Sequence, residues 1–200
     1  MKQLLHKSIR FGLSVAVITF VLAAIFSIIS TFLLSGVKWG LGMLIVFVIV
    51  LIGIFFDMLG IASTAADETP FHAMASKKVH GAKQAIFITR HADRFASFCN
   101  DVIGDISGIV SGTASAIVII QLTTGFGYGE ESAFQFVVSV IFTSVVAALT
   151  VGGKALGKSF AIRYSTDIIY RVGQLFYLVE DKLKVKILKE KKGRKNSTRK

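Results

Sequence analysis

The stretch Gly53–Glu68, GIFFDMLGIASTAADE, decides the fold because it places a carboxylate inside a long apolar run. That run begins near Trp39, and Asp57 is the only charged residue between Trp39 and Ala66. An ionisable group in a membrane span costs roughly 2.5–3.5 kcal/mol on insertion scales, so it normally faces a cavity or a partner. Small residues, which let another helix approach closely, follow this carboxylate: Gly60, Ala62, Ser63, Thr64, Ala65 and Ala66. We therefore expect a polar site between membrane helices.

The composition of the whole chain points in the same direction. Its 200 residues are 53% hydrophobic and have a mean hydropathy of +0.67, which is typical of a membrane protein with several spans. At roughly 1.5 Å per residue, four apolar runs can each cross about 30 Å of hydrocarbon. These runs are Phe11–Leu34, Trp39–Ala66, Ile106–Thr124 and Ala133–Gly153. The prediction is an all-α membrane protein of about four transmembrane helices, with short amphipathic helices beside the membrane.

The distribution of the net charge of +11 predicts the orientation in the membrane. Five cations lie in the connection 67–101, whereas the connection GFGYGEES has none and carries Glu130 and Glu131. Positive-inside counting then places both termini and the connection 67–101 in the cytoplasm, for a multi-pass protein of the inner cell membrane. The tail Lys182–Lys200 holds ten Lys or Arg residues, which predicts attraction to anionic lipid head groups. A short tail without aromatic residues does not indicate nucleic-acid binding.

The third apolar run carries two parallel rows of small residues. Gly104, Gly108, Gly112 and Ala116 form one row at four-residue spacing, and Ser107, Ser111 and Ser115 form the other. One explanation is close packing of helices, which the glycines alone would permit. The other is a polar cavity beside Asp105, because hydroxyl and carboxylate oxygens are the ligands that Mg²⁺ accepts. The sequence leaves both explanations open.

The remaining polar segments suggest helices at the membrane surface rather than a catalytic domain. Residues 69–100 and 159–185 have the apolar spacing of amphipathic helices. His72, His80 and His91 fit no zinc-binding spacing, and the one cysteine, Cys99, excludes an internal disulfide. No Walker loop, HExxH helix or GxSxG elbow is present, so we expect no enzymatic activity.

The segment from Trp39 to about Leu183 resembles the transmembrane domain of the CNNM/CorB–CorC group, the cyclin M-type magnesium transporters, without their CBS domains. The likeness lies in the order and spacing of several short stretches. They are FFDMLGIASTA at Phe55–Ala65, HGAK at His80–Lys83 followed by ADRF at Ala92–Phe95, GGKALGKSFA at Gly152–Ala161, and, more loosely, VIGD at Val102–Asp105. The resemblance divides the chain into an extra N-terminal helix (1–38), a CNNM/CorC-like domain with juxtamembrane helices (39–185) and a basic cytoplasmic tail (186–200).

The resemblance also implies which residues would form a cation site. The family builds its site from serine hydroxyls, an asparagine and a glutamate. At the matching positions this chain has Asp57 for a serine, Asp105 for the asparagine and Lys154 for the glutamate. The expected metal ligands are Asp57, Ser63, Asp105 and Ser107, and Lys154 would neutralise the site or couple to it.

Two functions follow as expectations. The first, implied by the resemblance, is a homodimeric transporter or exporter of divalent cations, Mg²⁺ foremost and Co²⁺ second. The second is a structural or regulatory membrane protein that keeps the fold but does not transport. In that case an ammonium group at Lys154 replaces the cation, since it opposes a second positive charge placed nearby.

Overall fold

The computed structural model describes residues 2–129 and 132–183, and within these ranges all regular secondary structure is helical. Four helical segments are long and apolar enough to cross a membrane: Gly12–Ser35, Trp39–Ala65, Ala92–Gly125 and Ala133–Arg163. The predicted all-α fold with four membrane-spanning helices is therefore confirmed. The expected tail at 186–200 and the acidic pair at 130–131 lie outside the described residues.

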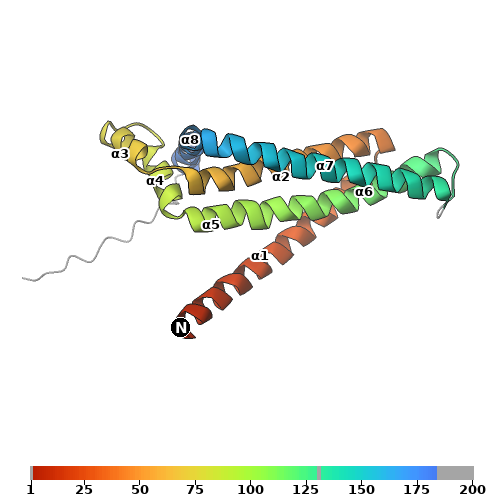
Figure 1. Ribbon diagram of the computed structural model, residues 1–200, viewed down its shortest axis with the longest axis horizontal. Coiled ribbons are helices and arrows are strands. Elements are labelled where there is room, and N and C mark those ends of the chain that lie inside the picture. Colours follow the sequence, from red (N-terminus) through yellow and green to blue (C-terminus); the bar gives the residue numbers. More distant parts are fainter. Residues whose placement is uncertain (1, 130–131, 184–200) are drawn as a thin grey trace, which may run out of the picture.

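Helix α2 (Trp39–Ala65) lies at the centre of the bundle, with α6 (Asp105–Gly125) and α7 (Ala133–Arg163) packed beside it (Figure 1). On one side, Val46 of α2 and Val118 of α6 are almost completely buried in a shared apolar cluster. On the other side, Gly153 and Gly157 of α7 lie directly against side chains of α2. Because these glycines have no Cβ, α7 approaches α2 closely over this stretch.

Helix α1 (Lys2–Ser35) packs along the third span but approaches α2 closely only at its C-terminal end. Leu34 is buried with Val46 and Val118, and the Gln121 side-chain amide donates a 2.9 Å hydrogen bond to the Leu34 carbonyl. Towards its N-terminus α1 crosses α6 and diverges from α2 (Figure 1). Large apolar side chains on its outer face, such as Phe20, are exposed, as expected for a helix surrounded by lipid.

The third span is longer than the predicted run Ile106–Thr124. It begins with α5 (Ala92–Ser97), continues as a π-helix, η1 (Phe98–Gly104), and ends as α6. The polar residues between Ser97 and Asp105 interrupt the apolar pattern, so the sequence alone places the start of this span at Ile106. Short π-helical segments within α-helices occur frequently at functional sites.

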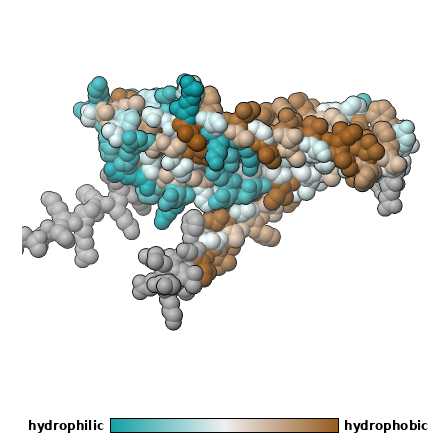
Figure 2. All heavy atoms as spheres, in the orientation of Figure 1, coloured by the Kyte–Doolittle hydropathy of each residue, from teal (hydrophilic) through white to brown (hydrophobic). Residues whose placement is uncertain are grey.

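Three shorter helices cover the end of the bundle at which α2 and α7 finish, which we call the polar end. They are α3 (Thr69–Ser76), α4 (Ala82–Arg90) and α8 (Ser165–Leu183), and hydrophilic side chains gather there in Figure 2. Phe71 and Ile169 are fully buried in the apolar cluster that joins these helices to α2 and α7. The predicted amphipathic helices are confirmed, although α7 continues to Arg163 instead of ending near Gly153.

A group of charges fastens the start of α3, just after α2, to α4. The Arg90 guanidinium donates a 2.7 Å hydrogen bond to Glu68, and His72 lies 3.2 Å from the second oxygen of the same carboxylate. Partial burial tends to raise the pKa of Glu68, but the hydrogen bonds from His72 and Arg90 outweigh it and lower that pKa. This contribution to stability is present above the carboxyl's unfolded-state pKa and is lost as the pH falls through its lower folded-state pKa.

Helices α4 and α8 cross at two glycines. Gly81 precedes α4 with a φ of +87°, a left-handed conformation that favours glycine. A Cβ added to Gly173 would lie 2.5 Å from the Gly81 carbonyl oxygen and 2.9 Å from the Ala85 backbone nitrogen. The two backbones are therefore too close for any side chain at residue 173.

We expect Gly173→Ala to lower the free energy of unfolding by about 1–3 kcal/mol, because a methyl group here must push two backbones apart. Gly152→Ala, inside α7, is the matched control, since nothing lies within 4 Å of the added Cβ and alanine favours a helix. Thermal unfolding of both variants in detergent measures the difference. Equal unfolding temperatures would contradict the close crossing.

Candidate ion-pair site between the membrane helices

One face of α2 organises the candidate site. Gly53, Asp57 and Gly60 are spaced by four and three residues, so they lie on the same side of the helix. A Cβ added to Gly53 would lie 2.9 Å from Ser107 Cβ, which places α6 against this face. The two glycines thus bring neighbouring helices close to the helix turn that carries the carboxylate.

Asp57 faces Lys154 of α7. Lys154 Nζ lies 4.0 Å from Asp57 Oδ1, and the exposed fractions of the two side chains are 29% and 17%. This separation is longer than the 2.7–2.9 Å typical of a charge-assisted hydrogen bond. The two charges therefore neutralise each other across a gap that a direct hydrogen bond does not close.

The approach of α7 to α2 positions Lys154. Gly153 fits against the Ile54 side chain, and one turn later a Cβ on Gly157 would lie 3.6 Å from Ile54 and 3.8 Å from Met58. On the opposite side, the ammonium group lies 3.8 Å from the point where a Cβ of Gly104 would be. Glycine at residue 104 therefore leaves space for the ammonium beside the π-helix.

Asn100 is a residue of this region that the sequence analysis did not single out. Any side chain at Gly60 would overlap the Asn100 amide, so the absence of a Cβ at Gly60 makes room for it. Asn100 Oδ1 is buried and has no hydrogen-bond partner among the described residues. A buried amide oxygen without a partner is an available acceptor for an ammonium, a water molecule or a cation. An asparagine that follows an apolar helix turn, SFCN, was the only sequence signal for it.

The two expected serine ligands are buried, but one is already engaged. Ser63 is 1% exposed and its hydroxyl donates a 2.7 Å hydrogen bond to the Gly60 carbonyl of its own helix. Ser107 is 8% exposed and lies against Gly53 of α2. Of the two, Ser107 is the one at the contact between α6 and α2, against Gly53, which lies one helix turn before Asp57.

Asp105 does not join the pair. Counted at about 1.5 Å per residue from the ends farthest from the polar end, Asp57, Asp105 and Lys154 lie about 27, 30 and 32 Å along their helices. They are therefore at one level of the bundle, as expected. However, Asp105 is exposed and forms no ion pair with the residues that the structure describes. Successive helical residues point in different directions, so Gly104 faces Lys154 while Asp105 faces outward.

The two rows of small residues in α6 have different environments. Ser107, Ser111 and Ser115 are buried, whereas Gly108 and Gly112 have open space where a side chain would be. Packing within the chain therefore uses the serine row. The outward glycine row is free to meet another chain, and the expected homodimer stays a prediction.

The three histidines considered as possible metal ligands each contact a group outside the candidate site. His72 pairs with Glu68, the His80 ring packs at a tilt against Tyr177 with ring centroids 4.8 Å apart, and the His91 ring lies 2.9 Å from the Phe87 carbonyl oxygen. Within residues 2–129 and 132–183, no three His, Cys, Asp or Glu side chains gather as a metal site. The four expected ligands thus supply one carboxylate, that of Asp57, to the region around Lys154.

Comparison with protein-family models, with curated proteins and with solved structures finds no match for this chain. The resemblance to the CNNM/CorB–CorC group therefore stays a prediction. The features that bear on function are the arrangement of Asp57, Lys154 and Asn100 and the helices around them.

We expect Lys154→Met to lower the free energy of unfolding by about 1–3 kcal/mol, because it leaves Asp57 without a partner. This is less than the roughly 3–5 kcal/mol lost when one member of a fully buried pair is removed, because both side chains here are partly exposed. Combining Lys154→Met with Asp57→Asn should recover most of that loss, since the coupling of a contacting pair appears in a double-mutant cycle. Lys158→Met, at an exposed position one turn later, is the control. Additive effects of the two substitutions would show that the pair has no energetic coupling.

Proposed function

We propose that this protein is a structural or regulatory membrane protein in which Lys154 takes the place of a bound cation. The observation that carries the proposal is the 4.0 Å distance between Lys154 Nζ and Asp57 Oδ1 at the junction of α2, η1 and α7. One ammonium and one carboxylate leave this junction with a net charge of about zero. A divalent cation placed there would face the ammonium at short range, where repulsion between unit charges is about 4 kcal/mol at 4 Å and an effective dielectric of 20.

The ion pair lies where it can control the polar end. Asp57 is on α2, which leads into α3, and Lys154 is on α7, which leads into α8. Close to the polar end, the Ser165 hydroxyl of α8 lies 3.4 Å from the Ala65 carbonyl of α2. Separation of α2 from α7 would therefore alter the spacing of the surface helices, which is the physical basis for a regulatory role.

The proposed orientation has the polar end in the cytoplasm. The cations of α4 and of the connection between α3 and α4 lie at this end, as positive-inside counting requires. The N-terminus of α1 and the end of α8 lie on the same side of the bundle (Figure 1). For a bacterial chain this corresponds to an inner-membrane protein with both termini inside.

Transport of divalent cations, Mg²⁺ first and Co²⁺ second, is the other candidate function. One observation favours it: Asn100 Oδ1 is buried without a partner beside the helix turn of Asp57. Amide and carboxylate oxygens are ligands that hard cations accept. In this case Lys154 would have to withdraw when an ion enters, and the long Asp57–Lys154 distance makes that step less unfavourable.

Direct metal binding separates the two candidates. If Lys154 replaces the cation, titration calorimetry of the purified protein should detect no binding of Mg²⁺, Co²⁺ or Mn²⁺, and Lys154→Glu should create a site. Lys158→Glu is the control, because it adds the same charge at an exposed position one turn away. Binding by the natural protein that Asp57→Asn abolishes would instead support transport and refute the proposed replacement.

Cysteine labelling in intact cells tests the orientation. After Cys99→Ser, a cysteine introduced at Tyr128, in the connection between α6 and α7, should react with an impermeant reagent. A cysteine at Ser197 should react only after the membrane is permeabilised, because positive-inside counting places the C-terminus in the cytoplasm. The opposite pattern would overturn the proposed orientation.

A further inference from the structure

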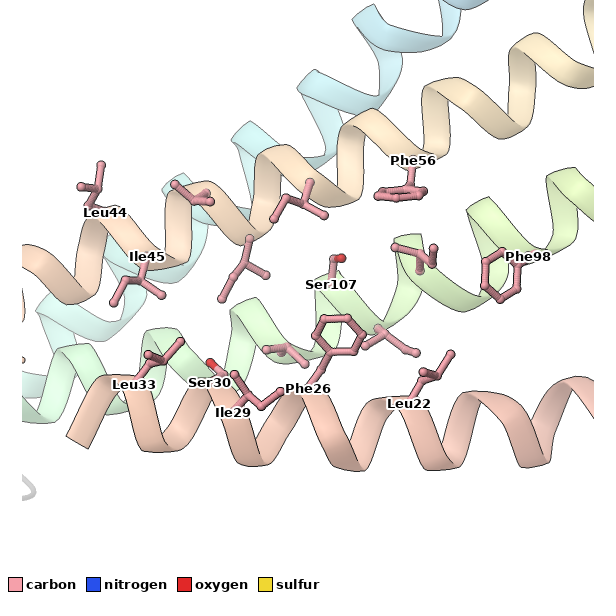
Figure 3. Close-up of a pocket in the computed structure, with 16 residues that line it drawn as sticks. Leu22, Phe26, Ile29, Ser30, Leu33, Leu44, Ile45, Phe56, Phe98 and Ser107 are labelled. Atoms are coloured by element: carbon pink, nitrogen blue, oxygen red, sulfur yellow. The ribbon is translucent and has the colours of Figure 1, made fainter. Parts of the chain in front are cut away.

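A large apolar cavity lies between α1, α2 and α6. Its volume is about 600 Å³, and fourteen of its sixteen lining residues are apolar, the other two being Ser30 and Ser107. Figure 3 shows Leu22, Phe26 and Ile29 of α1 on one side and side chains of α2 on the other. The cavity exists because α1 diverges from α2, and it lies among helices that are apolar enough to cross a membrane.

Phe98, the first residue of the π-helix, connects this cavity to a second one. The ring lines the cavity beside α1 and also a cavity of about 300 Å³ between α4, α5 and α8. The second cavity is partly polar, with these lining residues: Gln84, Phe87, Ile88, His91, Arg94, Phe95, Phe176 and Glu180. Both cavities therefore border on one aromatic ring, and the second one differs from the first in carrying charged and polar side chains in a mostly apolar wall.

The second cavity carries charges of both signs. Arg94 supplies a guanidinium, whose planar donors match phosphate oxygens. Glu180 supplies a carboxylate, which accepts a 2.7 Å hydrogen bond from the side chain of Gln84, a residue that is 8% exposed. This combination suits a ligand that carries a phosphate and an ammonium group, and the phenylalanine rings around it add favourable surfaces for a cation.

The depth of the second cavity agrees with the head-group region of a membrane. At about 1.5 Å per residue, Phe98 lies about 40 Å and Arg94 about 46 Å from Gly125, at the other end of the span. A bilayer is about 30 Å thick in its hydrocarbon core and about 40–45 Å with its head groups. At that distance Arg94 lies at the outer edge of the head-group region, from which its long side chain can reach back to a phosphate, while the larger cavity extends from Phe98 into the hydrocarbon.

We propose that the two cavities bind one phosphatidylethanolamine molecule from the leaflet at the polar end. One acyl chain fills the cavity between α1, α2 and α6 and passes Phe98. The phosphate binds Arg94, and the ammonium group lies near Glu180 among the phenylalanine rings. This site does not use the Asp57–Lys154 pair, so it stands or falls independently of the proposed function.

Lipid retention tests the proposal. The protein is reconstituted in vesicles of phosphatidylethanolamine, phosphatidylglycerol and phosphatidylcholine in equal amounts with identical chains, extracted, and analysed by native mass spectrometry. We expect one retained phosphatidylethanolamine per chain, at least fivefold above either other lipid. Arg94→Gln should reduce retention at least fivefold, whereas Arg163→Gln, at another exposed arginine of the polar end, should not. Equal retention of the three lipids, or equal loss in the two variants, would overturn the site.

A second pair of variants tests the acyl-chain cavity. Val48→Phe adds bulk to a residue that lines the cavity and is 45% exposed. Val140→Phe adds the same bulk on α7 at a residue that is 48% exposed and lines none of the cavities described here. Only Val48→Phe should lower retention at least fivefold, with both variants unfolding at the temperature of the natural protein. Unchanged retention in Val48→Phe would show that the chain lies elsewhere.

Discussion

An ionised carboxylate within an apolar helix needs a partner, and that constraint governs the arrangement of the bundle. Asp57 obtains its partner from α7, which must approach α2 closely enough for a lysine side chain to reach it. Gly153 and Gly157 permit that approach because they place bare backbone against Ile54 and Met58. The ion pair and the close packing of the two helices therefore depend on each other. Without the close approach Asp57 would lie in the bundle without a partner, and without the two charges the helices would lose an electrostatic attraction.

The glycines of α2 likewise permit the third span to approach α2 closely. Gly53 brings α6 against the face that carries Asp57, and Gly60 makes room for the Asn100 amide. The span is π-helical where it passes this face, from Phe98 to Gly104. Because one π-helical turn adds a residue, it rotates everything before it relative to α6. Asn100 and Gly104, four residues apart, both face the site, whereas Asp105, one residue after Gly104, faces outward.

Some features of this structure follow from hydrophobicity summed over many residues, and others depend on the direction of single side chains. Apolar runs and cation counts predict the four spans and the surface helices, because both depend on hydrophobicity summed over many residues. The pairing of Asp57 with Lys154 also follows from the sequence, since each charge is isolated in an apolar helix. The roles of Asp105 and Asn100 depend on which side of the span faces α2 and α7, and hydropathy alone does not determine that side. No residue pattern predicts the π-helix, so the site residues on this span can be identified only from the structure.

The divergence of α1 has a physical explanation of the same kind. Within residues 2–129 and 132–183 its apolar run contains no ionisable group after Arg10, so no ion pair draws it onto α2 along its length. It packs along the third span through Val15, Leu22 and Ala23, but it reaches α2 only near Leu34, where the hydrogen bond from Gln121 to the Leu34 carbonyl also holds it. In lipid the hydrophobic effect gives no reason for the rest of an apolar helix to prefer protein over acyl chains. The crevice between α1 and α2 is therefore the expected consequence of a helix that lies on the third span and meets α2 at one end only, and lipid is the component of its surroundings best suited to fill it.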